Sequence, residues 1–199
     1  LMRGKHRSTP IAQLIAEAQE LESRGVVELN LISQDTTWYG RDLVRGIAGA
    51  VEPFVGVMPG DLADRGSRSA ERGRNFGMLT ELLERLIGET SIPWLRLFYM
   101  YPSGIHEGLV DLIARTPRIL PYLDLPIQHG SDRILKLMRR PERRATILDR
   151  VHWLRDAIPD VTLRTTLIVG FPGETDGDFR EMLDLLEEVQ FDYLGAFPY

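Results

Sequence analysis

Apolar residues along the chain follow two spacings, and the two alternate. Short apolar runs that favour strands cover residues 26–32, 94–100, 119–127, 162–169 and 192–197. Between these runs, apolar residues recur every three or four positions, as on the buried face of a helix. The segments with helical spacing cover residues 11–23, 78–87, 108–115, 134–138, 144–157 and 175–189.

Strands that alternate with helices predict an α/β fold with a parallel sheet and right-handed crossovers. Polar segments that contain glycine follow four of the strands, at residues 33–40, 101–104, 128–132 and 170–175. Polar loops of this kind gather at the C-terminal mouth of a barrel. An open doubly wound sheet would instead carry a glycine fingerprint after its first strand, where Ser33, Gln34 and Asp35 stand. We therefore expect a barrel.

The segment after the strand 162–169 has features of a ligand-binding turn. Gly170 and Gly173 permit a tight turn, and Pro172 fixes φ. Thr175, followed three positions later by Asp178, resembles a capping box at a helix start. A strand, a glycine turn and a helix N-terminus in sequence suit an anionic or polar ligand. An ordinary strand-to-helix turn would use the same residues, and the sequence leaves both interpretations open.

Residues 41–76 break the regular pattern. They are rich in glycine and arginine and have weak periodicity, so we expect an irregular insertion within a single domain that covers residues 1–199. Loops of this length are usually functional or disordered.

Composition narrows the class of protein. No apolar run approaches the roughly 20 residues that a membrane span needs, and no signal-peptide core follows the basic N-terminus. A cytoplasmic protein with no membrane association is therefore expected. The chain has no cysteine, which excludes disulfides, thiol nucleophiles and a thiolate-held metal cluster within these residues.

Charge is unevenly placed although the net charge is only −5. Arginines gather in residues 65–74 and 139–144. Each cluster fits a solvated surface, and together they could form a basic rim that contacts an acidic partner or RNA.

Polar and aromatic residues near the strand ends could bind a zwitterionic, nucleoside-like ligand. Carboxylates would bind its ammonium group, arginine its carboxylate, amides and hydroxyls its ribose, and phenylalanine its base. The candidates are Gln34, Asp35, Gln128, Arg164, Thr166, Glu174 and Phe197. Simpler roles also exist: Asp35 could cap a helix, His129 could brace a turn, and Asp124 could pair with a neighbouring barrel residue.

Residues 32–40, 120–140 and 166–175 resemble the radical SAM core of the methylthiotransferases. The resemblance covers nearly the whole chain except residues 41–75. Residues 170–175 are shared with other radical SAM enzymes, whereas residues 34–37 and 126–131 are similar to the RimO-type branch. That branch methylthiolates an aspartate of a small-subunit ribosomal protein. The tRNA-modifying MiaB-type branch is the alternative within the family.

This resemblance implies a partial TIM-type (βα)6 barrel that binds S-adenosylmethionine (SAM). It also implies a 4Fe-4S cluster held by cysteines in a loop after the first barrel strand, and a second cluster on an N-terminal domain. In the family the cluster loop directly precedes a motif similar to Met2, Arg3 and Gly4. We therefore expect four parts of the parent enzyme to lie outside these residues: the first strand, the cluster loop, the N-terminal methylthiotransferase domain and the C-terminal TRAM domain.

A fragment of that kind would be inactive alone and would leave the edge of the strand 26–32 unpaired. Two other functions remain open from the sequence. One is a cluster-free barrel fragment that only binds protein or RNA through its arginine clusters. The other is an unrelated barrel enzyme that binds a phosphorylated metabolite at residues 170–175.

Overall fold

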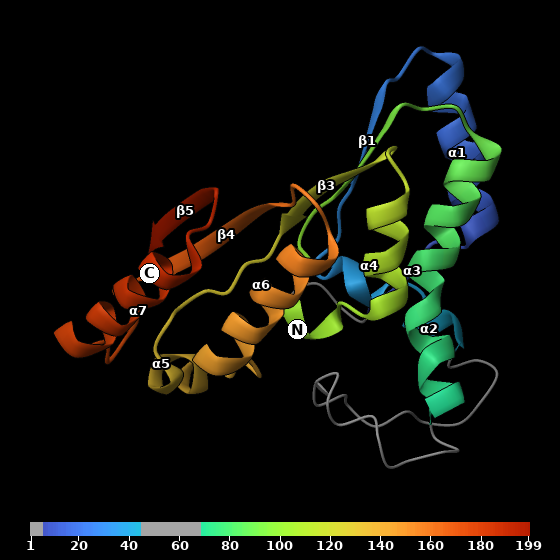
Figure 1. Cartoon of the computed structure of the whole chain (residues 1–199). Coiled ribbons are helices and arrows are strands. Elements are labelled where there is room, and N and C mark those ends of the chain that lie inside the picture. The colour runs from blue at the N-terminus through green and yellow to red at the C-terminus, as the bar shows by residue number, and fades with distance from the viewer. Residues whose placement is uncertain (1–5, 45–68) are drawn as a thin grey trace.

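The computed structural model describes residues 6–44 and 69–199, with the backbone alone for Val44 and residues 69–77. Strands and helices alternate along the chain, as the apolar spacing predicts (Figure 1). The strands are β1 (Glu28–Leu31), β2 (Trp94–Leu97), β3 (Ile119–Asp124), β4 (Thr162–Val169) and β5 (Tyr193–Pro198). The helices are α1 (Ile11–Ser23), α2 (Arg41–Val44), α3 (Ser69–Glu89), α4 (Glu107–Arg115), α5 (Asp132–Leu137), α6 (Arg144–Ala157) and α7 (Asp176–Val189). Two 3₁₀ turns, η1 (Thr36–Trp38) and η3 (Pro102–Gly104), follow β1 and β2.

All neighbouring strands are parallel, and their order in the sheet is β1-β2-β3-β4-β5. Sequential order is what right-handed crossovers in a barrel produce, because each helix returns the chain beside the strand it has just left. The expectation of a parallel α/β fold of the barrel kind is therefore confirmed. Among the described residues β1 and β5 are the two edges of the sheet.

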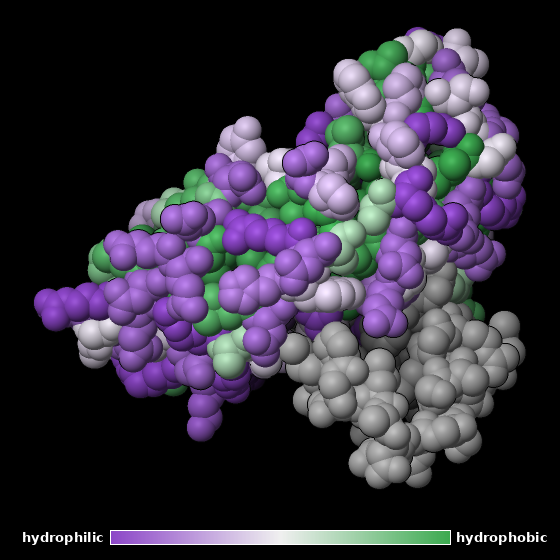
Figure 2. Space-filling view, in the orientation of Figure 1, coloured by the Kyte–Doolittle hydropathy of each residue, from purple (hydrophilic) through white to green (hydrophobic). Residues whose placement is uncertain are grey.

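The sheet has one covered face and one open face. Helices pack against the covered face (Figure 1), and along β4 buried side chains of this face alternate with partly exposed ones of the open face. The covered face is apolar, and its fully buried leucines include Leu95, Leu97, Leu123, Leu163 and Leu167. Away from this core the surface over α6 and α7 is largely hydrophilic (Figure 2).

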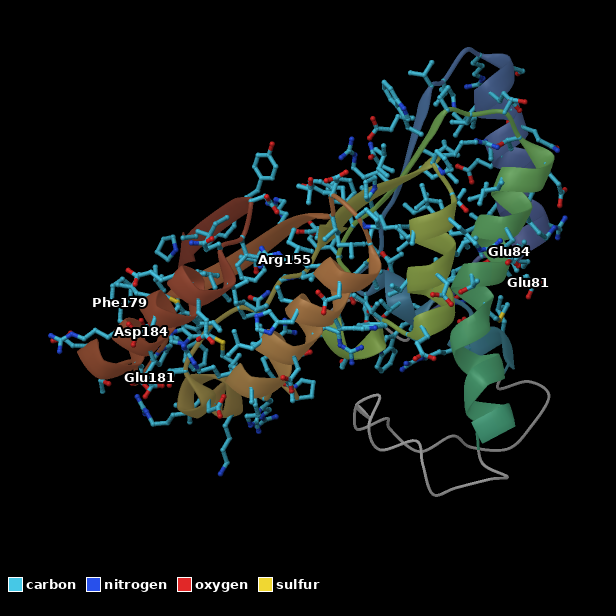
Figure 3. All side chains as sticks on the ribbon, viewed as in Figure 1. Glu81, Glu84, Arg155, Phe179, Glu181 and Asp184 are labelled. Carbon is cyan, nitrogen blue, oxygen red and sulfur yellow. The ribbon has the colours of Figure 1, made fainter. Side chains whose placement is uncertain are left out.

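The helix α7 shows how local sequence sets an element's bounds. Thr175 and Asp178 form the predicted capping box, in which each side chain bonds the other's backbone. Met182, Leu185 and Val189 are buried on one face of the helix. Arg155 of α6 (labelled in Figure 3) donates to the carbonyl oxygen of Val189 over 2.6 Å at the end of α7.

Several predicted bounds differ from the structure. The strand β4 has the predicted limits, but β1, β2 and β3 are shorter than the apolar runs 26–32, 94–100 and 119–127. Tyr99 adopts a positive φ of 51°, which turns the chain soon after β2. Pro126 has no N–H for a sheet ladder. The strand β3 therefore ends before Pro126, although the apolar run in the sequence continues to residue 127.

The prediction that residues 41–76 are irregular is partly wrong, because α2 begins at Arg41 and α3 begins at Ser69. Helix propagation adds one hydrogen bond for each residue fixed, so a strongly periodic segment at 78–87 extends through preceding residues of weak pattern. The part of the insertion at 45–68 lies outside the described residues. No helix among the described residues is long and apolar enough to cross a membrane.

Candidate functional site at the carboxyl rim

Two charged side chains meet on the open face where β3 and β4 lie side by side. Asp124 and Arg164 are partners in the sheet register. Arg164 Nη1 donates to Asp124 Oδ1 over 2.6 Å, and the Asp124 side chain is fully buried. The hydrogen bond with Asp124 raises the pKa of Arg164. Because 31% of the Arg164 side chain is exposed, the guanidinium also faces the open side. The predicted pairing of Asp124 with a neighbouring barrel residue is confirmed.

Thr166 and Phe197 lie on the same face as Arg164. Arg164 Nη1 approaches Thr166 Oγ1 at 3.5 Å. Gly195 is the β5 partner of Thr166 and carries no side chain. A Cβ at Gly195 would lie 3.5 Å from the Phe197 ring and 3.7 Å from Arg164 Nη2. The Arg164 guanidinium, the Thr166 hydroxyl and the Phe197 ring, which is 54% exposed, therefore surround the space above Gly195.

Gln34 and Asp35 lie at the end of β1, which β2 and β3 separate from β4. Asp35 Oδ1 accepts hydrogen bonds from Thr37 N over 3.0 Å and from Thr37 Oγ1 over 2.5 Å, so Asp35 caps η1. Burial raises the pKa of Asp35, and the hydrogen bonds from Thr37 oppose that rise. Thr36 Oγ1 donates to the carbonyl oxygen of Phe98 over 2.6 Å. The capping role predicted for Asp35 is confirmed, and Gln34 beside it is exposed.

Gln128 follows β3 with a left-handed backbone, at a φ of 71°. Gln128 N donates to the Thr166 carbonyl oxygen over 2.9 Å, and Ile168 N donates to the Gln128 carbonyl oxygen over 2.8 Å. Non-glycine residues in this conformation are uncommon and often lie at functional sites. The structure therefore brings Gln128 to the rim directly beside Thr166.

The Glu174 side chain points into the protein, toward His129, and not toward the Arg164 group. Its side chain is 7% exposed, and its Oε1 lies 3.6 Å from Nε2 of the fully buried His129. Glu174 Oε2 accepts a hydrogen bond from Phe171 N over 2.9 Å. Glu174 thus lies within the turn after β4, and its contact with a ligand stays a prediction.

Asp178 binds the amide and hydroxyl of Thr175 at the end of this turn and the hydroxyl of Ser131 in the loop before α5. Its carboxylate accepts hydrogen bonds from Thr175 N over 2.9 Å, Thr175 Oγ1 over 2.5 Å and Ser131 Oγ over 2.8 Å. Arg133 also binds this carboxylate. The bond from Arg133 is the largest of the effects that hold the pKa of Asp178 well below its usual range, and the bonds from Thr175 and Ser131 add to it. Because the chain's own carboxylates occupy the donors at Phe171 and Thr175, a phosphate site at 170–175 is not supported.

Four further side chains on the open face were not predicted as a group. Glu28 Oε1 lies 2.6 Å from Arg96 Nε, and the Arg96 guanidinium stands 4.8 Å from the centre of the Tyr122 ring. The Tyr122 and Tyr193 rings are 6.5 Å apart. The period-two alternation along the strands could have identified them, since it places alternate residues of neighbouring strands on one face. The prediction considered residues at the ends of the strands and within β4.

One cavity of about 410 Å³ lies away from the Arg164 group, between α1, β1 and α3. Leu14 and Leu21 of α1, Leu29 and Leu31 of β1 and Leu79 of α3 are among its lining residues. His6, Arg7, Glu17 and Asn30 also line it, but none of the predicted ligand-binding residues does, so the open face with Arg164 is the candidate site.

The residues present fit SAM but do not fit its cluster. Arg164 offers a cation, Thr166 a hydroxyl and Phe197 an exposed ring, and these are groups that a zwitterionic nucleoside such as SAM would need. No group of three or more metal-ligating side chains among the described residues could hold a metal ion. The sequence has no cysteine, so these residues cannot supply thiolates to a 4Fe-4S cluster.

Part of the predicted basic rim forms hydrogen bonds and an ion pair within the chain. Arg140 donates to the Pro126 carbonyl oxygen over 2.7 Å, Arg143 donates to that of Glu142 over 2.5 Å, and Arg144 pairs with Glu188 at 2.8 Å. These arginines of the 139–144 cluster therefore bind groups of the chain itself. The 65–74 cluster lies outside the described side chains.

Comparison with known families matches residues 1–186 to the radical SAM superfamily. The chain is 42% identical over 199 residues to the ribosomal protein uS12 methylthiotransferase RimO of Symbiobacterium thermophilum. It is 43% identical over 198 residues to the RimO of Geobacter sulfurreducens and 42% identical over 198 residues to that of Clostridioides difficile. All of this chain is covered, but it spans only 35%, 38% and 38% of these three relatives.

Solved structures agree on the fold. Streptococcus suis SuiB bound to S-adenosylmethionine matches 98% of this chain and 35% of its own, with a TM-score of 0.55 and 12% identity. SuiB bound to the precursor peptide SuiA matches 99% of this chain and 34% of its own, with a TM-score of 0.57 and 13% identity. At these identities the likeness extends to the fold alone.

Proposed function

Because this chain belongs to the radical SAM superfamily, we propose that it is the SAM-binding core of a methylthiotransferase. The complete protein would add a methylthio group to an aspartate of ribosomal protein uS12. The observation that carries this proposal is the 42% identity to a RimO enzyme across all 199 residues. The predicted resemblance of residues 34–37 and 126–131 to the RimO-type branch agrees with it.

SAM would bind at the carboxyl rim of the open face. Arg164, oriented by Asp124, would bind the carboxylate of SAM, and Phe197 would lie against its adenine. Thr166 and Gln128, joined by a backbone hydrogen bond, would contact the ribose. Gln34 and Asp35 would close the site from the end of β1, and Glu174 would hold in place the turn after β4 that borders it.

Radical SAM enzymes use SAM with a 4Fe-4S cluster, which supplies the reducing chemistry when it is bound. We assign the cluster ligands to the cysteine loop expected ahead of these residues. The strand that carries this loop would pair with the free edge of β1, beside the cavity lined by Leu29 and Leu31. An N-terminal methylthiotransferase domain and a C-terminal TRAM domain would complete the protein.

The proposed substrate is a ribosomal protein, so a cytoplasmic location follows from the proposal. Contact with RNA would accompany substrate docking. Arg140 and Arg143 bond backbone carbonyls and keep their charge, whereas Arg144 is paired with Glu188. The tRNA-modifying branch remains the alternative substrate class, and the relatives named above favour the ribosomal protein.

The first test measures SAM binding by the complete protein with its clusters reconstituted. Substitution Arg164→Gln removes the charge-assisted hydrogen bonds, so we expect Kd for SAM to rise about tenfold or more. Arg180→Gln, at an exposed position of α7, is the matched control and should leave Kd unchanged. Equal SAM affinity in the Arg164 and Arg180 variants would remove Arg164 from the site.

The second test measures the mass of the product. Ribosomal protein uS12 and tRNA are incubated separately with the complete protein, SAM, a reductant and a sulfur source. A methylthio mass increase on uS12 is expected, and an increase on tRNA alone would support the alternative branch.

A further inference from the structure

Two loops of the rim meet through a buried histidine and a nearly buried carboxylate. His129 lies in the loop between β3 and α5 and is 0% exposed. Glu174 lies in the loop between β4 and α7, and its side chain is 7% exposed. The distance from His129 Nε2 to Glu174 Oε1 is 3.6 Å. Loops that are distant in the sequence therefore face each other through two polar groups.

The hydrogen bonds define the state of the histidine. His129 Nδ1 accepts a hydrogen bond from Ser131 N over 2.9 Å, so the proton of the neutral ring is on Nε2. Burial lowers the pKa of His129, and the nearby Glu174 carboxylate opposes that change. The N–H at Nε2 thus faces Glu174 Oε1.

The buried donor at Nε2 has no hydrogen-bond partner among the described residues, because 3.6 Å exceeds hydrogen-bond distance. Buried donors without a partner are rare and costly in folded proteins. The carboxylate of Glu174 is the acidic group within 4.0 Å of Nε2, and its negative charge offsets that cost.

Each member of the pair lies beside a backbone segment that is held by hydrogen bonds. His129 directly follows Gln128, whose φ is 71° and whose N and O both bond to β4. Glu174 Oε2 accepts the hydrogen bond from Phe171 N at the start of the turn 170–173. The pair consequently lies between two segments whose backbone conformations are unusual.

We propose that His129 and Glu174 form an interloop latch. The latch is a pair of positioning residues that holds the Gln128 backbone in register with the turn 170–173, so that SAM meets a preformed rim. SAM as the ligand rests on the proposed function, whereas the latch itself rests on the contacts given above. Glu174 then acts through His129 instead of touching SAM.

Two substitutions of His129 separate the latch from a local structural role. Asparagine places an acceptor near the Nδ1 position, so His129→Asn keeps the bond to Ser131 N and loses the donor toward Glu174. Glutamine places an amide nitrogen near the Nε2 position, so His129→Gln keeps the donor toward Glu174 and loses the acceptor for Ser131 N. If the pair is a latch, the glutamine variant should keep exchange and SAM affinity closer to those of the unaltered protein. If His129 only braces Ser131, the asparagine variant should do so.

The first readout is hydrogen exchange in the complete protein, measured by mass spectrometry on a peptide that covers residues 166–175. This peptide lies in the loop that His129 does not belong to. We expect His129→Asn to accelerate its exchange about tenfold, and His129→Gln to stay within about twofold of the unaltered protein. His152→Asn, at an exposed position of α6, is the matched control and should change nothing.

The second readout is Kd for SAM by calorimetry on the same variants. His129→Asn should weaken binding about tenfold, and His129→Gln should largely restore it. Unchanged exchange of 166–175 in His129→Asn, or equal damage by both variants, would overturn the latch. If the unaltered protein does not bind SAM, the proposed function fails and the exchange experiment still decides whether the latch exists.

Discussion

Asp178 shows how one carboxylate connects separate segments at the residue scale. It accepts hydrogen bonds from Ser131 before α5, from Thr175 before α7 and from Arg133 within α5. Its side chain is 5% exposed, so these bonds replace water around a buried charge. The arrangement fixes α5 against the start of α7.

The depressed pKa of Asp178 predicts a pH dependence of stability. In the unfolded chain the carboxyl titrates near a pKa of about 3.9, and in the folded chain it titrates well below that value. A group whose folded pKa is depressed stabilises the fold above the unfolded pKa, and this contribution is lost as pH falls through the folded pKa. Asp178→Asn should therefore lower the melting temperature by several degrees at neutral pH, and by progressively less below about pH 4.

Thermal unfolding at a series of pH values checks this expectation. Asp176→Asn, at an exposed position two residues earlier, serves as the control. A melting-temperature deficit of Asp178→Asn that is the same at neutral and acidic pH would contradict the assigned cause.

At the scale of elements, α7 lies very close to the loop after β3. A Cβ placed on Gly130 would lie 2.6 Å from Cα of Met182 in the middle of α7. The glycine is needed for this close approach, because backbone atoms cannot move aside as a flexible side chain can. The loop that carries His129 is thereby pressed against the helix that carries Asp178.

Gly130→Ala is therefore expected to push the loop and α7 apart. We expect a loss of about 1–3 kcal/mol in the free energy of unfolding, as for other overpacked positions. Gly177→Ala is the matched control: a Cβ there would lie 3.6 Å from Thr175 Oγ1, an ordinary contact. Denaturant unfolding measures both variants, and equal stability of the two would show that the loop yields at little cost.

At the scale of the whole molecule, the sheet has two unpaired edges among the described residues. Val27 O and Leu31 O accept hydrogen bonds from β2, so the backbone groups of Glu28 and Asn30 between them point away from the sheet. Exposed edges of this kind are templates for pairing with another chain. The unpaired edge expected from the sequence thus has a defined place in the structure.

The 199-residue chain alone is expected to self-associate as its concentration rises. Asn30→Pro removes one outward N–H, which proline tolerates at an edge, and should weaken association about tenfold. Sedimentation velocity over a concentration series measures both chains. A chain that stays monomeric at every concentration would contradict the role of the β1 edge.

Local features of the sequence were sufficient to predict most of the helices and strands. The strand β4 was predicted with its limits, because a continuous β-rich run ends at Gly170. The start of α7 followed from Thr175 and Asp178, since a capping box depends on residues three positions apart. The beginning of α3 was missed because its first residues have no periodic apolar pattern.

The sequence by itself also determined the family, through motifs that residues 1–186 share with the radical SAM superfamily. Only the tertiary structure decided which candidates meet. It joined Arg164 to Asp124, placed Arg164 beside Gly195 of β5 and directed Glu174 toward His129. These contacts depend on strand register and on the directions of side chains in the loops. Register follows from packing of the whole sheet against its helices, so no local spacing in the chain encodes it.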